Sequence, residues 1–355
     1  MLGRHPLHNL EFGSTLPPDR ERGVWKEILQ TPFGILLVTT LSLTLGACGS
    51  GRRGSRDWSA APAVFTLTGT PEIDAMGDIH GDLATALQVL KAARLVDASS
   101  HWMGGNRTLV ITGDVIDKGM SALPVIDLLI TLEQEARAAG GNVVVTLGNH
   151  EAEFLANPTD DKSLEFQAEL AAAGLKPADV ASGQGVYGSW LHTRPVAALI
   201  DGWFFCHAGN SDGDSVATIG KKFRNLFEQP ASASGGLSGF DDSFLTGSKS
   251  LLEATLWWEK GSSSTATIDA SLGALPAQHL VFGHDPGDID FPDDPDGKRK
   301  AGKMVTRYDA RIFLLDVGMS YAIGYSDGSL LKIVRGSVDS AAMIDHDGTS
   351  TPLWH

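Results

Sequence analysis

The stretch Gly77-Asp78-Ile79-His80-Gly81 follows directly on residues 72–76, a short run whose composition predicts a β-strand. In an extended segment, residues two apart point to the same side, so Asp78 and His80 can direct an oxygen and a nitrogen toward one point. The flanking glycines allow the backbone to turn sharply and to approach a ligand closely. Taken alone, the stretch fits a metal site or, more simply, a capped helix start.

The same arrangement of an apolar strand, a glycine and a hard ligand occurs twice more, and two further predicted strands end at single histidines. These blocks are Gly113-Asp114-Val115-Ile116-Asp117-Lys118-Gly119, Gly148-Asn149-His150-Glu151, His207-Ala208-Gly209 and Gly283-His284. Because binding sites in α/β folds lie at the carboxyl ends of strands, the five strand ends predict one common site. Carboxylates, imidazoles and an amide, without thiolates, favour a hard or borderline divalent metal such as Mn, Fe or Zn.

The tracts between these blocks predict an α/β core. Asp82 can cap a helix with Leu83, Leu87 and Leu90 on its apolar face, and residues 122–139 form a second helical pattern that stops at two glycines. Predicted strands alternate with these helices. They cover 108–112, 142–147, 203–206, 279–282, 312–315, 321–325 and 330–334. Residues 151–193 are predicted to be largely helical, either as a cap over the site or as an insertion packed on the core.

As a set, the blocks resemble the calcineurin-like metallophosphoesterases of the phosphoprotein phosphatase superfamily, whose pattern is GDxHG, GDxxDRG, GNHE, HGG and GH. Two positions depart from it: Lys118 replaces an arginine, and Ala208 replaces a glycine. The intervening tracts are most similar to the Shewanella-like branch of bacterial and plant phosphatases. The resemblance implies a four-layer α/β/β/α sandwich with a dinuclear metal site at strand carboxyl ends.

The resemblance also implies a role for each matching residue. Asp78 and His80 would hold the first metal, Asp114 would bridge both, and Asn149, His207 and His284 would complete the second. Two divalent ions, Mn before Fe or Zn, would activate a bridging hydroxide for direct attack on phosphorus.

The same family pattern implies the acid–base and substrate-binding residues. His150 would protonate the leaving oxygen, Asp117 would fix its tautomer, and Lys118 would hold a phosphate oxygen. Related enzymes carry a second phosphate-binding arginine, and Lys260 is a candidate for that position, although it is more simply a surface lysine. Lysine keeps the charge of arginine and loses its bidentate fork.

The amino-terminal region predicts export. A charge-free apolar run from Phe33 to Leu45 ends in Leu45-Gly46-Ala47-Cys48, which resembles the lipobox of bacterial lipoproteins, with Cys48 as the lipidated residue. The location expected is therefore the bacterial cell envelope, through a lipid anchor in the membrane. Ordered structure is expected from about Val64. We divide the chain into a disordered extension (1–31), a signal segment (32–48), a linker (49–70), a catalytic domain (71–335) and a polar, frayed tail (336–355).

Composition narrows the class of partner. The chain has 43 acidic and 28 basic residues, a formal net charge of −15, and no long basic run, so we expect no nucleic-acid partner. Two cysteines are too few for a disulfide framework or a thiolate zinc site. The function expected is a metal-dependent phosphomonoesterase acting on phosphoprotein, with a weak lean toward phosphotyrosine. The alternatives are a dinucleoside polyphosphate or nucleotide hydrolase and a lipid-anchored binding protein without catalysis. The oligomeric state is left open.

Overall fold

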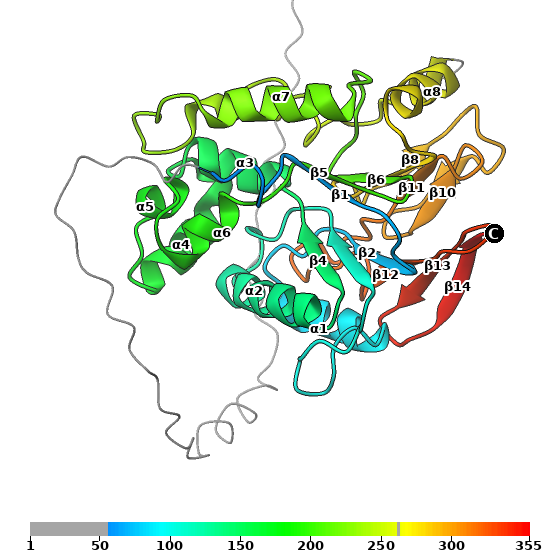
Figure 1. Ribbon diagram of the computed structural model, residues 1–355, viewed down its shortest axis with the longest axis horizontal. Helices are drawn as coiled ribbons and strands as arrows, with labels where there is room; N and C mark the ends of the chain where they lie inside the picture. Colours follow the sequence, from blue (N-terminus) through cyan, green and yellow to red (C-terminus); the bar gives the residue numbers. More distant parts are fainter. Residues whose placement is uncertain (1–55, 261–262) are drawn as a thin grey trace, which may run out of the picture. The chain divides into compact units, whose positions relative to one another are not determined.

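Two six-stranded sheets dominate the part of the chain that the computed structural model describes, residues 56–260 and 263–355 (Figure 1). The first sheet consists, in spatial order, of β1 (Val64–Leu67), β5 (Ala197–Ile200), β6 (Trp203–Cys206), β7 (His279–Phe282), β11 (Ile312–Leu314) and β10 (Val305–Arg307). The second consists of β14 (Ser350–Trp354), β13 (Ser340–Asp345), β12 (Ser329–Val334), β2 (Glu72–Met76), β3 (Thr108–Ile111) and β4 (Asn142–Val145). A small ribbon pairs β8 (Ile289–Asp290) with β9 (Lys298–Arg299).

Helices cover both outer faces of the sheet pair. On one side α1 (Leu83–Ala92) packs against β13 and α2 (Ala122–Ala138) against β4. On the other side lie α7 (Val216–Phe227), which contacts β1, and α8 (Ser264–Ala274) (Figure 1). The result is the α/β/β/α layering that the family resemblance implied.

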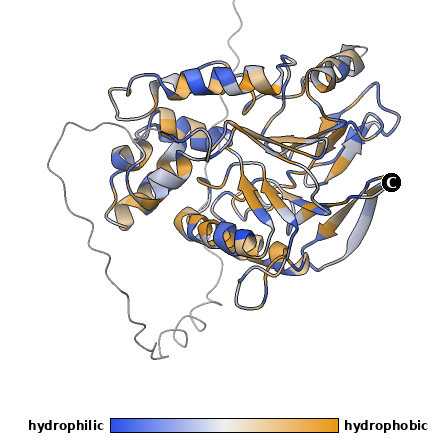
Figure 2. Cartoon of the chain, in the orientation of Figure 1, coloured by the Kyte–Doolittle hydropathy of each residue, from blue (hydrophilic) through white to orange (hydrophobic). Residues whose placement is uncertain are grey.

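Burial on both faces explains the composition of the central strands. Leu109, Val110 and Ile111 of β3 are all fully buried, since a strand between a helix layer and a second sheet has no solvent face. Figure 2 shows apolar residues concentrated on the strands of both sheets. The buried apolar residues of the two sheets form one continuous hydrophobic cluster.

The helix starts and stops agree with their sequence signals. The carboxylate of Asp82 accepts a hydrogen bond from the Thr85 amide at 3.0 Å and caps α1. Helix α2 ends at Ala138, and Gly140 follows with φ +82°, a conformation that favours glycine.

The 151–193 region is helical, as predicted, and packs by its apolar side chains. It contains α3 (Asn149–Ala156), the short 3₁₀ turn η1 (Asp161–Ser163), α4 (Leu164–Ala172), α5 (Pro177–Ala181) and α6 (Gly185–Leu191). Phe154 and Phe166 are fully buried with their ring centroids 4.8 Å apart, and α4 contacts α2. These contacts make the segment an insertion packed on the core, whereas Leu164 is exposed.

Two domain boundaries predicted from the sequence are too narrow. Strand β1 lies within the predicted linker and pairs in parallel with β5, and Trp58 stacks edge-on against Phe223 and Phe227. Ordered structure was expected from Val64, where β1 begins, but a four-residue strand has too little periodicity to be assigned from the sequence. The extension, the signal segment and the start of the linker lie outside the described residues.

The tail after residue 335 is also ordered, contrary to the prediction. Strands β13 and β14 form an antiparallel hairpin on β12, and Trp354 packs on His279 with ring centroids 4.8 Å apart. The half-buried Leu353 and Trp354 pack on the core, whereas the first three residues of the strand are exposed. Conversely, residues 321–325 form a turn and not the predicted closing strand. No helix of the described residues is both long and apolar enough to cross a membrane.

Candidate metal centre

The five ligand-bearing strand ends meet at one edge of the sheet pair. Strands β2, β3 and β4 are parallel neighbours in one sheet, and β6, β7 and β11 are parallel neighbours in the other. The carboxyl ends of parallel neighbours lie side by side, so each sheet presents its polar residues at one edge. Contacts between ligands from the two sheets, such as His207 with Asp114, show that these two edges face each other.

Close backbone packing brings the loops after β3 and β4 together. A Cβ on Gly113 would lie 2.3 Å from the amide nitrogen of Gly148, and Gly113 has φ +96°. A Cβ on Gly148 would lie 2.1 Å from a carboxylate oxygen of Asp114. Only glycine fits at either position, and this explains the glycine that begins each block.

Five of the predicted site residues adopt left-handed backbone conformations. The φ angles are +46° for His80, +50° for Asp114, +62° for Asp117, +60° for Lys118 and +71° for His284. Such values are uncommon outside glycine and cost free energy, so they cluster where side-chain placement matters more than local stability. Asp78 and His80 are therefore brought together by sharp turns of the backbone. The extended geometry predicted from their two-residue spacing is not what places them.

Glu151 holds the Asp114 loop in this conformation. One carboxylate oxygen accepts hydrogen bonds from the amides of Val115 and Ile116, at 2.8 and 3.1 Å. The other accepts from the amides of Asp114 and Gly148, at 2.9 and 2.8 Å. No role was predicted for Glu151. Its position in the first turn of a helix is the sequence feature that could have indicated hydrogen bonds to backbone amides.

Imidazoles surround the carboxylate of Asp114. Its Oδ2 lies 3.3 Å from His207 Nε2, 3.6 Å from His80 Nε2 and 3.9 Å from His150 Nε2. His80 and His207 place their Nδ1 atoms on the backbone carbonyls of Ile116 and Thr112, at 3.2 and 2.7 Å. These outer contacts orient both rings so that Nε2 faces the centre.

The remaining predicted ligands lie beside this core. Asn149 Oδ1 is 3.0 Å and His284 Nδ1 is 3.2 Å from His207 Nε2. Asp78 Oδ2 is 3.9 Å from His80 Nε2, while its Oδ1 accepts a hydrogen bond from the His284 amide. All six residues predicted as metal ligands therefore come together in the fold.

The donor set fits two divalent ions. Among the described residues, His80, Asp114 and His150 form one group, and Asp114, His207 and His284 form another, with the ligand atoms of each group within 4.8 Å of one another. Asp114 belongs to both groups, as expected of a bridging ligand. The first group contains His150 where the sequence analysis had Asp78, so Asp78 lies further from the centre of that group than predicted.

The ionisable groups of the centre form a tightly paired cluster. Burial acts to raise the pKa of Asp114, but His207 and His150 together outweigh it and hold that pKa well below its ordinary value. Burial acts to lower the pKa of His207, and Asp114 followed by Asp78 raises it to about 10. Asp114 and His207 therefore stabilise each other's charged forms.

Asp117 orients His150. Its Oδ2 lies 3.2 Å from His150 Nδ1, and its Oδ1 accepts a hydrogen bond from the Phe166 amide at 3.1 Å. Burial would lower the pKa of His150, but Asp114 and then Asp117 raise it overall. The ring therefore presents Nε2 to the centre and can carry a proton there.

The two candidate phosphate-binding lysines differ in placement. Lys118 is exposed beside the centre, close enough that its charge lowers the pKa of His80. Lys260 is also exposed, and its backbone carbonyl accepts a hydrogen bond from the Ser263 hydroxyl at 3.1 Å. No contact within the described residues brings Lys260 to the metal ligands.

The two cysteines fall outside the centre. Cys206 is a free, buried thiol whose pKa burial raises to about 12, as expected of a small hydrophobic residue and not of a nucleophile. Cys48 lies outside the described residues.

Asp316, which follows β11, was not singled out as a site residue. It is buried, its Oδ1 accepts a hydrogen bond from the Gly318 amide at 2.8 Å, and after burial itself it is the leading cause that raises the pKa of Asp78. Its carbonyl accepts from the guanidinium of buried Arg299 at 3.1 Å. The sequence feature that could have identified Asp316 is its position as an acidic residue just after a sixth strand.

The fold and the predicted metal ligands agree with the result of the comparison with protein families. The model of the calcineurin-like phosphoesterases matches residues 72–303, and the chain belongs to this family. It is a hydrolase of phosphate esters, in a family that normally holds two divalent metals.

Relatives extend the comparison. The chain is 43% identical over 77 residues to Shewanella-like protein phosphatase 2 of Arabidopsis thaliana, and 36% identical over 80 residues to Shewanella-like protein phosphatase 1 of Plasmodium berghei. These matches cover 22% of this chain, and 20% and 22% of the two relatives. The chain thus spans about a fifth of their length in matched sequence. An uncharacterized protein of Schizosaccharomyces pombe matches at 28% identity over 75% of this chain and 78% of its own.

Solved structures share the fold. A cold-active protein tyrosine phosphatase superposes with a TM-score of 0.65 at 20% identity, over 83% of this chain and 82% of that chain. A cold-active protein-tyrosine phosphatase of a psychrophilic Shewanella gives 0.60 at 19% identity, over 86% and 87%.

Proposed function

We propose that this chain is a two-metal phosphomonoesterase whose substrate is a phosphorylated protein or peptide. The observation that carries the proposal is the shared position of Asp114 in two ligand groups, one of which contains His150 held by Asp117. The similarity to protein phosphatases supports a protein substrate over a nucleotide. We propose Mn as the preferred metal, with Fe or Zn as alternatives, because the donors are carboxylate, imidazole and amide.

The chain's own residues divide the reaction between them. Asp78, His80, Asp114, Asn149, His207 and His284 would hold the ions. When bound, the ions supply positive charge for the phosphate oxygens and increase the acidity of water. Lys118 contributes a further cation for one phosphate oxygen. His150 donates a proton from Nε2 to the leaving oxygen, and Asp117 keeps the ring in position through Nδ1.

Turnover of p-nitrophenyl phosphate tests the activity. We expect the purified full-length chain to hydrolyse it with added Mn, and a chelator or Asp114→Asn to abolish turnover. Metal analysis of the same sample identifies the ions held. Absence of turnover with Mn, Fe and Zn would refute the enzyme and leave a binding protein.

A substrate panel tests the class of ester. Phosphotyrosine peptide, phosphoserine peptide and diadenosine tetraphosphate are compared at equal concentration. Higher kcat/KM for either peptide supports the proposal, with phosphotyrosine as the expected leader. Preferential cleavage of diadenosine tetraphosphate would refute the protein substrate and favour the dinucleoside polyphosphate hydrolase.

For the cell, we propose an exported enzyme anchored to the envelope membrane by lipid on Cys48. The lipobox-like Leu45-Gly46-Ala47-Cys48 supports this proposal. Mass spectrometry of the membrane-extracted protein should find a diacylated Cys48 at the amino terminus. A mature chain that still begins at Met1 would refute it.

A further inference from the structure

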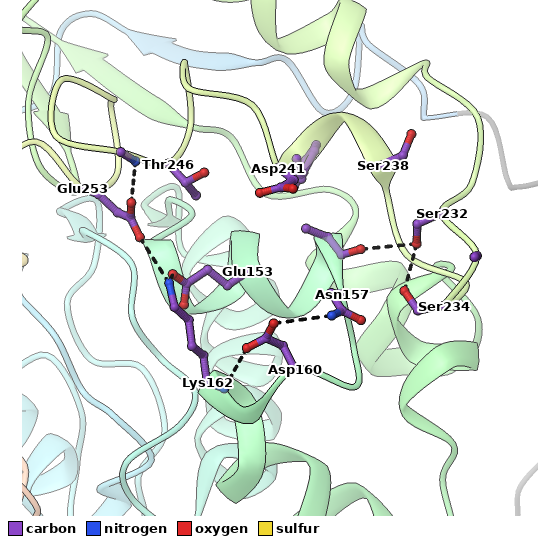
Figure 3. Close-up of a pocket in the computed structure, with 14 residues that line it drawn as sticks. Glu153, Asn157, Asp160, Lys162, Ser232, Ser234, Ser238, Asp241, Thr246 and Glu253 are labelled. Carbon is purple, nitrogen blue, oxygen red and sulfur yellow. Dashed lines mark hydrogen bonds and ion pairs between the residues drawn. The ribbon is translucent and has the colours of Figure 1, made fainter.

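A hollow of about 710 Å³ opens along α3, the helix that carries His150 (Figure 3). Its walls come from α3, from the turn at η1 and from two loops, 232–241 and 246–253. The proposed mechanism uses none of its lining residues. Small serines and a glycine line its outer part, so the space is not filled by large side chains.

Helix register connects this hollow to the reacting atoms. His150 and Glu153 are three residues apart on α3 and therefore lie on the same face, with Asn157 one turn further on. The charge of His150 affects the pKa of Glu153, and the charge of Glu253 affects the pKa of His284. The inner end of the hollow thus lies on the same face of α3 as His150.

The inner end contains two carboxylates with one counter-ion. Lys162 forms an ion pair with Glu153 and lies 3.9 Å from Glu253 (Figure 3). Burial raises the pKa of Glu153, and a side-chain hydrogen bond with Glu253 adds to that rise against the effect of Lys162. The two carboxylates are therefore close to each other and share one lysine.

Exposure shows which member of this trio can move. The side chain of Glu153 is 10% exposed and that of Glu253 22%, whereas that of Lys162 is 61% exposed. Lys162 reaches the two carboxylates from the solvent side, so an incoming cation can replace it there, and the buried Glu153 is not left unpaired. Asp160 and Asp241 add two more carboxylates to the lining, in which Lys162 is the cation.

We propose that this hollow binds a cationic side chain, lysine or arginine, that flanks the phosphorylated residue of the substrate. The incoming cation displaces Lys162 from Glu153 and Glu253 and neutralises the acid pair. This inference rests on the proposed phosphatase function and specifies its substrate class.

The dimensions place the cation close to the phosphorylated residue. A helix rises about 1.5 Å per residue, so along α3 the hollow begins about 5 Å from His150 and ends about 10 Å from it. An extended peptide advances about 3.3 Å per residue. The cationic side chain should therefore lie about one to three residues from the phosphorylated one.

The test uses matched peptides and opposite variants of the full-length chain. One phosphotyrosine peptide is made with Arg, Ala or Glu at each of the flanking positions, and kcat/KM is measured for each. We expect the Arg peptide to exceed the Ala peptide by roughly fivefold at one or more positions, and the Glu peptide to be poorest. Using the ratio of two peptides removes any general effect of a variant on folding or turnover.

The variants should move this ratio in opposite directions. Glu253→Gln removes one of the paired acids and should reduce the Arg-to-Ala ratio toward one. Lys162→Met removes the competing cation and should raise it, which a merely misfolded variant would not do. Glu228→Gln removes an exposed carboxylate at the end of α7, outside the hollow, and is the matched control.

Three results would overturn the proposal. Equal kcat/KM for the Arg, Ala and Glu peptides would refute the cation site and leave the phosphatase intact. A Glu228→Gln effect as large as that of Glu253→Gln would assign the preference to net charge. Absence of turnover of every peptide would refute the proposed function as well.

Discussion

At the scale of the residue, some features of the metal centre could be predicted from the sequence and others could not. Asp78, His80 and Asp114 were visible because each follows an apolar strand and a glycine. The left-handed backbone at His80 and Asp114 was not visible, since it depends on contacts with distant loops. Glu151 was missed for the same reason, because its four amide donors come from two separate blocks.

Lys118 is the residue at which the chemistry departs from the family pattern. Lys118→Arg should retain or raise kcat/KM on p-nitrophenyl phosphate, because the guanidinium restores bidentate contact with phosphate. Lys118→Ala should lower kcat/KM by roughly 10- to 100-fold, the effect of losing one charge-assisted hydrogen bond. If the arginine variant is as impaired as the alanine variant, the site is built for lysine.

Glu151 should matter for folding even without metal. In Glu151→Gln, one of two carboxylate oxygens becomes an NH₂ group, and either orientation sets it against two amide donors. We expect a loss of about 2–4 kcal/mol in the free energy of unfolding. Urea unfolding in excess chelator measures it. An unchanged midpoint would show that water replaces these contacts.

At the scale of the element, the length of the hydrophobic pattern decided which helices and strands could be predicted from the sequence. The 17-residue α2 shows several turns of apolar period and was predicted to within a residue of its ends. Strand β1 has four residues, and its identity comes from pairing with β5, over 120 residues away in the chain. Residues 321–325 are apolar enough for a strand, but hydrogen bonds of the Ser320 carbonyl to Ile323 and Gly324 make a turn.

Strand β14 should contribute to stability, although its composition predicted a frayed tail. Trp354→Ala removes ring contacts with His279, Trp203 and Phe313. Because the ring is half-buried, we expect a loss of about 1–3 kcal/mol in the free energy of unfolding. Thermal unfolding by circular dichroism measures it, with exposed Val338→Ala as the control. A melting temperature equal to that of the wild type would mean that β14 is not docked in solution.

At the scale of the whole molecule, charged groups affect both which partners the chain attracts and how stable its fold is. A chain of formal charge −15 attracts anionic substrates only where local cations act, and we propose Lys118 and the metal centre for that role. One carboxylate of this acidic chain lies within a sheet, away from solvent. Asp74 on β2 is fully buried, and one of its oxygens has no hydrogen-bond partner among the described residues.

Asp74 should make global stability depend on pH. Burial raises its pKa from 3.8 to about 7, with Arg107 opposing the rise. Below pH 4 both folded and unfolded chains hold this proton, so the contribution of Asp74 is fully present. Between pH 4 and 7 only the folded chain holds it, and the stability that it contributes is lost as the pH rises through 7. The loss is at most about 4 kcal/mol.

Asp74→Asn isolates this effect, because asparagine cannot ionise and Arg107 keeps its ion pair with Glu72 at 2.9 Å. Urea unfolding of wild type and variant at pH 5 and pH 8, both in chelator, measures the difference. The wild type should lose stability relative to the variant between these two values. Since the metal ligands are the same in both proteins, their titration cancels in the comparison. Parallel behaviour of the two proteins would mean that Asp74 is ionised in the folded state across this range, so that Arg107 outweighs burial.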